Sequence, residues 1–313
     1  MSHRDRFVLY TCRPNKAIFK NCILFFRTPG CYNIFMIIDF HTHIFSEDIA
    51  RRATEKLSKG ADLPVFTDST ATGLIASMEK AGVDISLILP VATKPSQVDV
   101  LNRSAIECNH RFSLDSKAGT FPLMSFGALH PECGNYRDIL KELSENGIRG
   151  IKLHPVFQNT PMDDIRYKRI TYYARELGLM VLFHVGRDAT YLDTTLSSHK
   201  YAAGLLSDVG TDDIILAHMG GWAEWAEVPE FLSKYPVLVD TAFSLGPTKN
   251  PFGDMTDDCF MDVVRILGPD RILFGTDSPW TDQKTSIEYI NRLPLSNEDR
   301  QAILGDNARR LLL

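Results

Sequence analysis

Residues 36–43 read Met36-Ile37-Ile38-Asp39-Phe40-His41-Thr42-His43, an apolar run that ends in two histidines. The run predicts a buried β-strand, because β-branched and aromatic residues favour strands. Similar short apolar runs recur along the chain, and each is followed by a stretch with helical periodicity. We expect eight strands, at residues 37–41, 85–90, 123–129, 150–153, 180–184, 214–217, 237–240 and 272–275.

The order of these elements predicts the fold. Several runs are almost continuously apolar, which is typical of parallel strands covered on both faces. The stretches between them have amphipathic helical spacing, as at residues 71–81, 136–146, 165–177 and 261–267. Eight strands with intervening helices favour a single-domain α/β fold, a (β/α)8 TIM barrel. A doubly wound open sheet is the alternative, but no glycine-rich fingerprint follows the first strand.

Composition excludes several classes of protein. Of 313 residues, 44% are hydrophobic and 23% charged, as in ordinary globular proteins and unlike disordered or coiled-coil chains. The 34 lysines and arginines against 39 acidic residues give a net charge of −5. This acidic balance argues against nucleic acid or an anionic membrane as partner. No apolar run approaches the ~20 residues that span a bilayer. We expect a small-molecule substrate and a homodimer.

The cysteine pattern and the N-terminal residues indicate the cellular compartment and where the domain begins. The six cysteines form no CxxC pair, which predicts free thiols in a reducing compartment, here the cytoplasm. Residues 1–35 hold six basic residues and one acid, without a small-residue cleavage site. We expect residues 36–313 to form the domain and residues 1–35 to be a non-domain leader, disordered or no part of the true protein. A genuine N-terminal arm and a transit peptide are the alternatives.

The histidines cluster at one end of the predicted barrel. Six of the nine lie at or just after the carboxyl ends of predicted strands, the face where barrel enzymes build their active sites. We interpret this placement as functional rather than as chance packing. The six are His41, His43, His130, His154, His184 and His218.

Four of these side chains suit a metal centre. His41 and His43 are two residues apart on an extended chain, so both imidazoles can face the barrel axis and bind one ion. Asp39 would point the same way, either as a hydrogen-bond acceptor behind the ligands or as a residue of a barrel layer. His184 closes an apolar strand and is interpreted as a third nitrogen ligand. His218 closes the next strand, as a further ligand or as a group that polarises the substrate.

Asp277 follows the last predicted strand and precedes Ser278-Pro279-Trp280. A carboxylate there can bind a metal ion and accept a proton from an attacking water. The alternative is a helix N-cap.

Five segments together resemble the amidohydrolase superfamily, and most of all its amidohydrolase-related branch (amidohydrolase family 2), which includes aminocarboxymuconate-semialdehyde decarboxylase-like enzymes. The resemblance extends from Met36 to the C-terminus. It is carried by Ile38-Asp39-Phe40-His41-Thr42-His43, Gly150-Ile151-Lys152-Leu153-His154-Pro155, Leu182-Phe183-His184, Leu216-Ala217-His218-Met219-Gly220-Gly221 and Leu273-Phe274-Gly275-Thr276-Asp277-Ser278-Pro279-Trp280.

The resemblance implies a metal-dependent (β/α)8 barrel. It makes His41, His43 and His184 metal ligands and Asp277 both a ligand and the proton acceptor. It makes His218 a catalytic group that faces the substrate.

Lys152 has three interpretations. Some superfamily members carry a carboxylated lysine at this strand, bridging two metal ions. Lys152 could instead bind a substrate carboxylate or pair with an acidic residue in the barrel. Its spacing from His154 lets both side chains face the pocket. A bare ammonium repels a divalent cation, so Lys152 should be modified or lie some distance away.

Other residues on the same rim carry weaker signals. Arg187 is a candidate anion anchor three residues after His184. Trp222 and Trp280 could flank the substrate or pack under a loop. His130 could be structural or line the pocket. Residues 241–254, rich in Gly, Pro and Asn, are expected to shape the pocket mouth.

These residues predict metal-dependent chemistry. Nitrogen and carboxylate ligands suit one Zn²⁺, with Mn²⁺ as an alternative and two ions if Lys152 is carboxylated. We expect a hydrolase in which a metal-activated water cleaves an amide, lactone or ester of a small carboxylate-bearing substrate. The alternative is a non-oxidative decarboxylase of a small unsaturated or aromatic acid. An inactive ligand-binding barrel and a polymerase-associated phosphoesterase fit less well. A serine hydrolase and a P-loop enzyme lack their motifs here.

Overall fold

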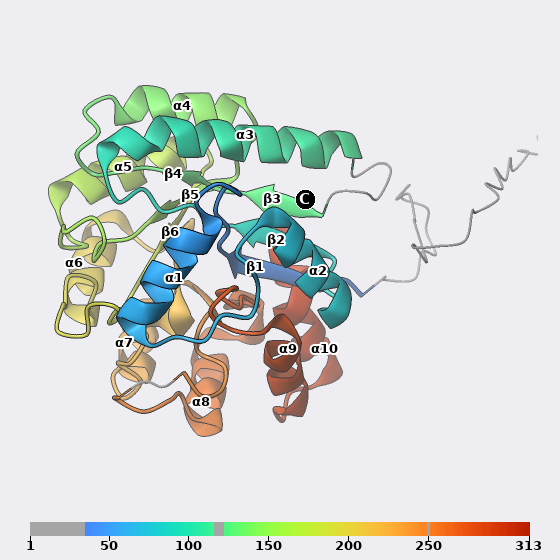
Figure 1. The fold of residues 1–313 in the computed structure, drawn as a ribbon. Helices are drawn as coiled ribbons and strands as arrows, with labels where there is room; N and C mark the ends of the chain where they lie inside the picture. The colour runs from blue at the N-terminus through green and yellow to red at the C-terminus, as the bar shows by residue number, and fades with distance from the viewer. Residues whose placement is uncertain (1–34, 116–121, 249–250) are drawn as a thin grey trace, which may run out of the picture.

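The computed structural model describes residues 35–115, 122–248 and 251–313, drawn in colour in Figure 1. The predicted leader lies outside these residues, apart from Phe35. All paired strands run parallel. They are β1 (Ile38–Thr42), β2 (Ile85–Ile88), β3 (Leu123–Ser125), β4 (Gly127–Ala128), β5 (Gly150–Leu153), β6 (Met180–Phe183), β7 (Ile214–Leu216), β8 (Leu238–Asp240) and β9 (Ile272–Leu273).

Backbone hydrogen bonds at two seams join these strands into a barrel. Strands β1 to β3 form one ladder and β4 to β9 another. Between β3 and β4, the N–H of Phe126 donates to the carbonyl of Ile88 in β2, so β3 and β4 form one interrupted strand of the barrel. At the other seam, the N–H of Phe40 donates to the carbonyl of Phe274 at 2.7 Å. With β3 and β4 counted as one strand, the described strands form the eight parallel strands of the predicted (β/α)8 barrel.

The helices of the described residues lie around the outside of the barrel, except for α1, which crosses in front of the strands (Figure 1). They are α1 (Ala50–Ala61), α2 (Ala71–Ala81), α3 (Val98–Asp115), α4 (Tyr136–Glu145), α5 (Ile165–Glu176), α6 (His199–Val209), α7 (Val228–Lys234), α8 (Asp257–Leu267), α9 (Gln283–Arg292), α10 (Asn297–Gln301) and α11 (Asn307–Leu312). The prediction for α2 is confirmed to the residue. Helix α8 begins four residues before its predicted start, because the Thr256 side chain caps it by accepting from the N–H of Cys259.

Apolar side chains fill the barrel interior. Ile38, Phe40, Leu87, Phe126 and Leu182 are fully buried there. The ring of Phe40 meets that of Phe126 edge to face, with centroids 5.7 Å apart. This packed interior supports the polar site at the carboxyl ends of the strands.

The predicted orientation of Asp39 is wrong. Its carboxylate accepts hydrogen bonds from the Thr276 side chain at 2.6 Å and from Gln283 of α9 at 2.8 Å. The pairing of β1 with β2 is irregular between Asp39 and Thr42. This irregularity breaks the simple alternation of sides, so Asp39 joins β1 to a helix while His41 faces the site.

Two smaller predictions concern the described residues only. Cys108, Cys133 and Cys259 are free thiols, as expected. Among these residues no helix has both the length and the apolar character needed to cross a membrane.

Truncation of Phe126 tests the barrel core. We expect Phe126→Ala to lower the free energy of unfolding by about 3–5 kcal/mol, because the lost ring leaves a cavity beside Phe40 in the barrel interior. Urea denaturation of the metal-free protein measures the loss. Val100→Ala, at a site 52% exposed, is the control and should change stability by less than about 0.5 kcal/mol. Equal effects for the two variants would contradict this account of the core.

Candidate metal centre and pocket

The predicted site residues converge at the carboxyl ends of the strands. His41 lies on β1 and His43 just after it, while His184, His218 and Asp277 follow β6, β7 and β9. Together with apolar side chains they line a cavity of about 240 Å³. His218 and Asp277 have positive φ angles of 60° and 66°. Such backbone strain in residues other than glycine is concentrated at functional sites.

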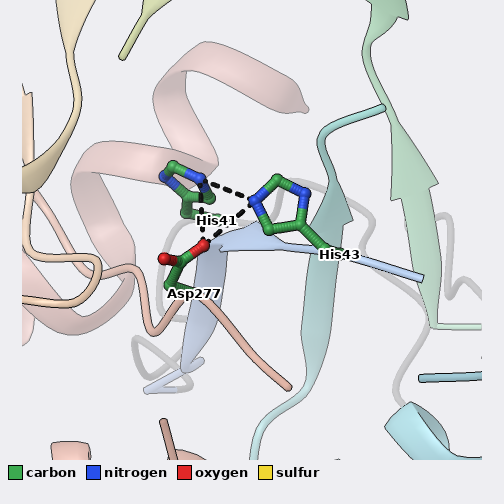
Figure 2. A group of neighbouring side chains, drawn as sticks. All are labelled: His41, His43 and Asp277. Atoms are coloured by element: carbon green, nitrogen blue, oxygen red, sulfur yellow. Dashed lines mark hydrogen bonds and ion pairs between the residues drawn. The ribbon is translucent and has the colours of Figure 1, made fainter. Parts of the chain in front are cut away.

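Three ligand-type atoms meet in a tight group, shown in Figure 2. The Nε2 atoms of His41 and His43 are 3.2 Å apart. The Oδ1 atom of Asp277 lies 3.0 Å from His43 Nε2 and 3.5 Å from His41 Nε2. We call His41, His43 and Asp277 the triad.

The outer nitrogens of the two imidazoles fix their tautomers. His43 Nδ1 lies 2.8 Å from the carbonyl oxygen of Leu89, so it must carry the proton. His41 Nδ1 lies 2.8 Å from the carboxylate of Asp240. Burial lowers the pKa of His41 to about 3, so the ring is neutral and donates its single proton to Asp240. The Nε2 atoms of both rings are thereby left to face each other with lone pairs, unless a second proton is added.

The triad suits a divalent cation. Burial alone would raise the pKa of Asp277, but the neighbouring imidazoles of His43 and His41 hold it well below its usual range. The site thus joins an ionised carboxylate to two nitrogen lone pairs. A proton on His43 would satisfy only one of the three contacts. Ligands about 2.0–2.2 Å from one ion lie roughly 3.0–3.5 Å from each other, which is the spacing observed.

His184 lies beside the triad and not within its three-atom group. Its Nδ1 is 2.9 Å from His218 Nε2, and its Nε2 is 2.9 Å from the Arg187 carbonyl. His218 Nδ1 in turn faces the Ala242 carbonyl at 2.9 Å. Carbonyl groups only accept, so the remaining nitrogens of both rings, which burial keeps neutral, oppose each other with lone pairs. A cation shared with the triad would relieve this contact, and the role of His184 as a third ligand stays a prediction.

Asp240 is a site residue that the sequence reasoning missed. Its carboxylate accepts from His41 Nδ1 and from the backbone N–H groups of His218 and Ala242, at 2.9 and 3.1 Å for the latter two. It is fully buried, which alone would raise its pKa, but His41, His218 and Lys152 together hold the pKa below its usual value. The available signal was its position, the last residue of the predicted strand at 237–240.

Lys152 lies in the centre and not at a distance from it. Its Nζ atom is 3.5 Å from His41 Nε2, and the side chain is fully buried. Burial lowers its pKa to about 8, although Asp240 and Asp277 act in the opposite direction. Of the two expected alternatives, modification or distance from the metal site, the structure does not show distance, because strand β5 directs this side chain at His41, and modification of Lys152 stays a prediction.

A second group lines the adjoining wall. The His154 ring stacks on His184 at 4.1 Å and on Phe157 at 4.0 Å, and its Nε2 lies 3.7 Å from Asp188. The ligand-type atoms of His154, His184 and Asp188 lie within 4.8 Å of one another, although the two nitrogens of His184 already face His218 Nε2 and the Arg187 carbonyl. Burial raises the pKa of Asp188 to about 6. His154 therefore belongs to the pocket wall, as predicted.

Three residues with weaker sequence signals lie at the pocket. Arg187, Trp222 and Trp280 line the cavity. The Arg187 guanidinium donates to the Leu192 carbonyl and lies over the Phe252 ring, 4.2 Å from its centroid.

His130 and the loop at residues 241–254 differ in their relation to the pocket. His130 does not line this cavity, and its Nδ1 accepts from the N–H of Glu132, which supports its structural interpretation. Phe243 lines the cavity, so the loop at residues 241–254 shapes the mouth where the structure describes it.

Comparison with known proteins identifies relatives of the whole barrel. The family profile described as Amidohydrolase matches residues 38–313. No protein of curated function matches the chain. One similar structure is a TIM-barrel protein of Bordetella bronchiseptica, with 18% identity and a TM-score of 0.67; the alignment covers 88% of this chain and 98% of the other.

Two similar structures have named activities. The manganese-bound 5-carboxyvanillate decarboxylase of Novosphingobium aromaticivorans is 12% identical, with a TM-score of 0.63 and coverage of 89% of this chain and 97% of the other. A proposed 2-pyrone-4,6-dicarboxylic acid hydrolase of Pseudomonas putida is 19% identical, with a TM-score of 0.59 and coverage of 89% and 98%. At these identities the likeness shows the fold alone.

Asp240 is expected to position His41. We predict that Asp240→Asn weakens Zn²⁺ binding by about 10–100-fold. The Asn oxygen would stay with the N–H groups of His218 and Ala242, so its NH₂ group would face the N–H of His41 Nδ1, which loses the acceptor that orients Nε2 toward the triad. Competition with a zinc-binding dye measures the affinity. Asp212→Asn, at an exposed carboxylate, is the control. Unchanged affinity in Asp240→Asn would contradict this role.

The depressed pKa of Lys152 predicts a pH dependence in the metal-free protein. The unfolded chain binds more protons than the folded chain between pH 8 and 10.5, so stability should rise with pH across that window. Relative to Lys152→Met, the free energy of unfolding of the wild type should increase by about 3 kcal/mol. Urea denaturation at several pH values measures the difference. A constant difference would show that Lys152 titrates normally or is modified.

Proposed function

We propose that this chain, which belongs to the amidohydrolase family, is a metal-dependent hydrolase that cleaves an amide, lactone or ester bond of a small carboxylate-bearing substrate. The convergence of His41 Nε2, His43 Nε2 and the ionised Asp277 at one wall of a small cavity carries the proposal.

The triad and His184 are the residues that would hold the ion. Nitrogen and carboxylate donors suit Zn²⁺, and Mn²⁺ is the alternative, as in the manganese-bound decarboxylase of similar fold. When bound, such an ion lowers the pKa of a water molecule and polarises a carbonyl group. One ion accounts for the triad, and a second would require carboxylation of Lys152.

Asp277 and His218 are the side chains that would transfer protons during hydrolysis. Asp277 is ionised and accepts a proton from the attacking water. It then returns that proton to the nitrogen or oxygen that leaves as the bond breaks. His218 is neutral, and its Nε2 offers a lone pair beside the triad, so it can accept a proton but cannot donate one from that atom.

Lys152 and the walls select the substrate. The buried ammonium beside His41 binds a carboxylate, which would also offset the positive charge of a nearby ion. A cavity of about 240 Å³ admits a single ring with substituents, since roughly 150 Å³ holds benzene. Phe157, Trp222, Phe243 and Trp280 give this cavity aromatic walls.

These aromatic walls also favour a second candidate, non-oxidative decarboxylation of a small aromatic or unsaturated acid. Several similar structures are decarboxylases of aromatic acids. In this reaction the carbon–carboxylate bond breaks, CO₂ leaves, and a proton replaces it on carbon. Asp277 or His218 would supply that proton after taking it from water.

A labelled-water experiment separates the two reactions. Zinc- or manganese-loaded protein is incubated in H₂¹⁸O with a panel of aromatic monocarboxylates, lactones and amides. Hydrolysis places one ¹⁸O in the product and releases no CO₂, whereas decarboxylation releases CO₂ from an unlabelled product. We expect Asp277→Asn to lower kcat at least about 100-fold, with Asp212→Asn as control. Turnover that survives in Asp277→Asn would contradict both candidates.

A further inference from the structure

Helix α1 covers the mouth of the pocket. Figure 1 shows it in blue, crossing in front of the strands and not lying in the outer ring. Leu57 of α1 and Leu63 just after it line the same cavity as the triad and Lys152. The segment at residues 46–68, inserted between β1 and α2, therefore forms one wall of the site.

This helix is weakly stabilised by its own sequence. Its N-cap, Ile49, makes no side-chain hydrogen bond, and Arg51 and Arg52 place positive charge at the positive end of the helix dipole. Gly60 lowers helix propensity near the other end. Leu57 is the only large apolar side chain in the helix. The attachment of α1 to the barrel therefore depends on few contacts.

Hydrogen bonds hold the segment at its two ends and at Thr54, in the middle of α1. The N–H of Phe45 donates to the Ser69 carbonyl at 2.7 Å and closes the two ends on each other. Thr54 Oγ1 donates to Ser69 Oγ at 2.7 Å, and the N–H of Phe66 donates to the Pro279 carbonyl at 2.9 Å. Thr54 lies in the middle of α1 and is buried, so these contacts hold the two ends of the segment and the first half of the helix. The turn that carries Leu57 is held by apolar packing.

The body of α1 rests on aromatic side chains. Leu57 and Leu63 are half-buried and pack against a cluster of Trp222, Ala223, Phe243 and Trp280. The outer face of the helix is charged, with Arg51 paired to Glu55 at 3.0 Å. Both leucines would become more buried if an apolar part of a ligand filled the cavity beneath them.

We propose that residues 46–68 are a lid and that Leu57 and Leu63 determine specificity, selecting substrates with an apolar group at the end opposite the carboxylate. The presence of a carboxylate on the substrate rests on the proposed function, whereas the lid does not depend on it. A charged or strongly hydrated distal group would lose its water against these leucines, and the Arg187 guanidinium of the same cavity is already engaged by the Leu192 carbonyl and the Phe252 ring.

Hydrogen exchange on the full, manganese-loaded chain tests the lid. We expect amides of α1 to exchange at least tenfold faster than those of α2, a helix of similar length that packs against α9. Addition of 4-ethylbenzoate should slow α1 at least fivefold and leave α2 unchanged. Equal exchange of α1 and α2 in the ligand-free protein would overturn the lid.

Calorimetric titration tests the specificity. 4-Ethylbenzoate should bind at least tenfold tighter than benzene-1,4-dicarboxylate. Leu57→Ser and Leu63→Ser should weaken 4-ethylbenzoate at least fivefold and benzoate less than twofold. Lys56→Ala, on the exposed outer face of α1, is the matched control. Equal affinities for the two para-substituted ligands, or variants without effect, would overturn the proposal.

A neutral probe separates this inference from the proposed function. 4-Ethylphenol carries the apolar group without a carboxylate. If it slows exchange in α1 while 4-ethylbenzoate does not, the lid is supported and the carboxylate-bearing substrate is contradicted. If neither compound slows α1, the lid is overturned.

Discussion

The hydrogen bond from His41 Nδ1 to the buried carboxylate of Asp240 is the contact on which the site depends. It fixes the proton on one side of the ring and leaves Nε2 as a lone pair that faces His43 and Asp277. Three electron-rich atoms held this closely in a buried site require positive charge. The barrel supplies the rigidity to hold them, because its parallel strands end together at one rim.

The need for balanced charge at the triad also concerns Lys152 and the substrate pocket. Lys152 beside His41 places a second charge at the floor, so a bound ion and this ammonium need further negative charge between them. A substrate carboxylate fits that need, which links the metal centre to the choice of substrate. In the proposed lid, the apolar side chains under α1 would select the opposite end of the ligand.

Much of this arrangement could be predicted from sequence. The period of two in a strand identified the pairs His41–His43 and Lys152–His154, and the rule that barrel sites lie at strand ends identified His184, His218 and Asp277. Asp39 was misplaced because an irregular pairing in β1 breaks that period. Asp240 was missed because a single acid at the end of an apolar strand has no distinctive spacing. The position of α1 depends on packing between loops, which local periodicity does not encode.

The most direct test of the account is anomalous X-ray diffraction at the zinc and manganese edges, from crystals of the metal-loaded protein. The account predicts one ion roughly 2.0–2.3 Å from His41 Nε2, His43 Nε2 and Asp277 Oδ1. An ion bound instead between His154 and Asp188, or no ion at the triad in metal-saturated crystals, would contradict the central claim.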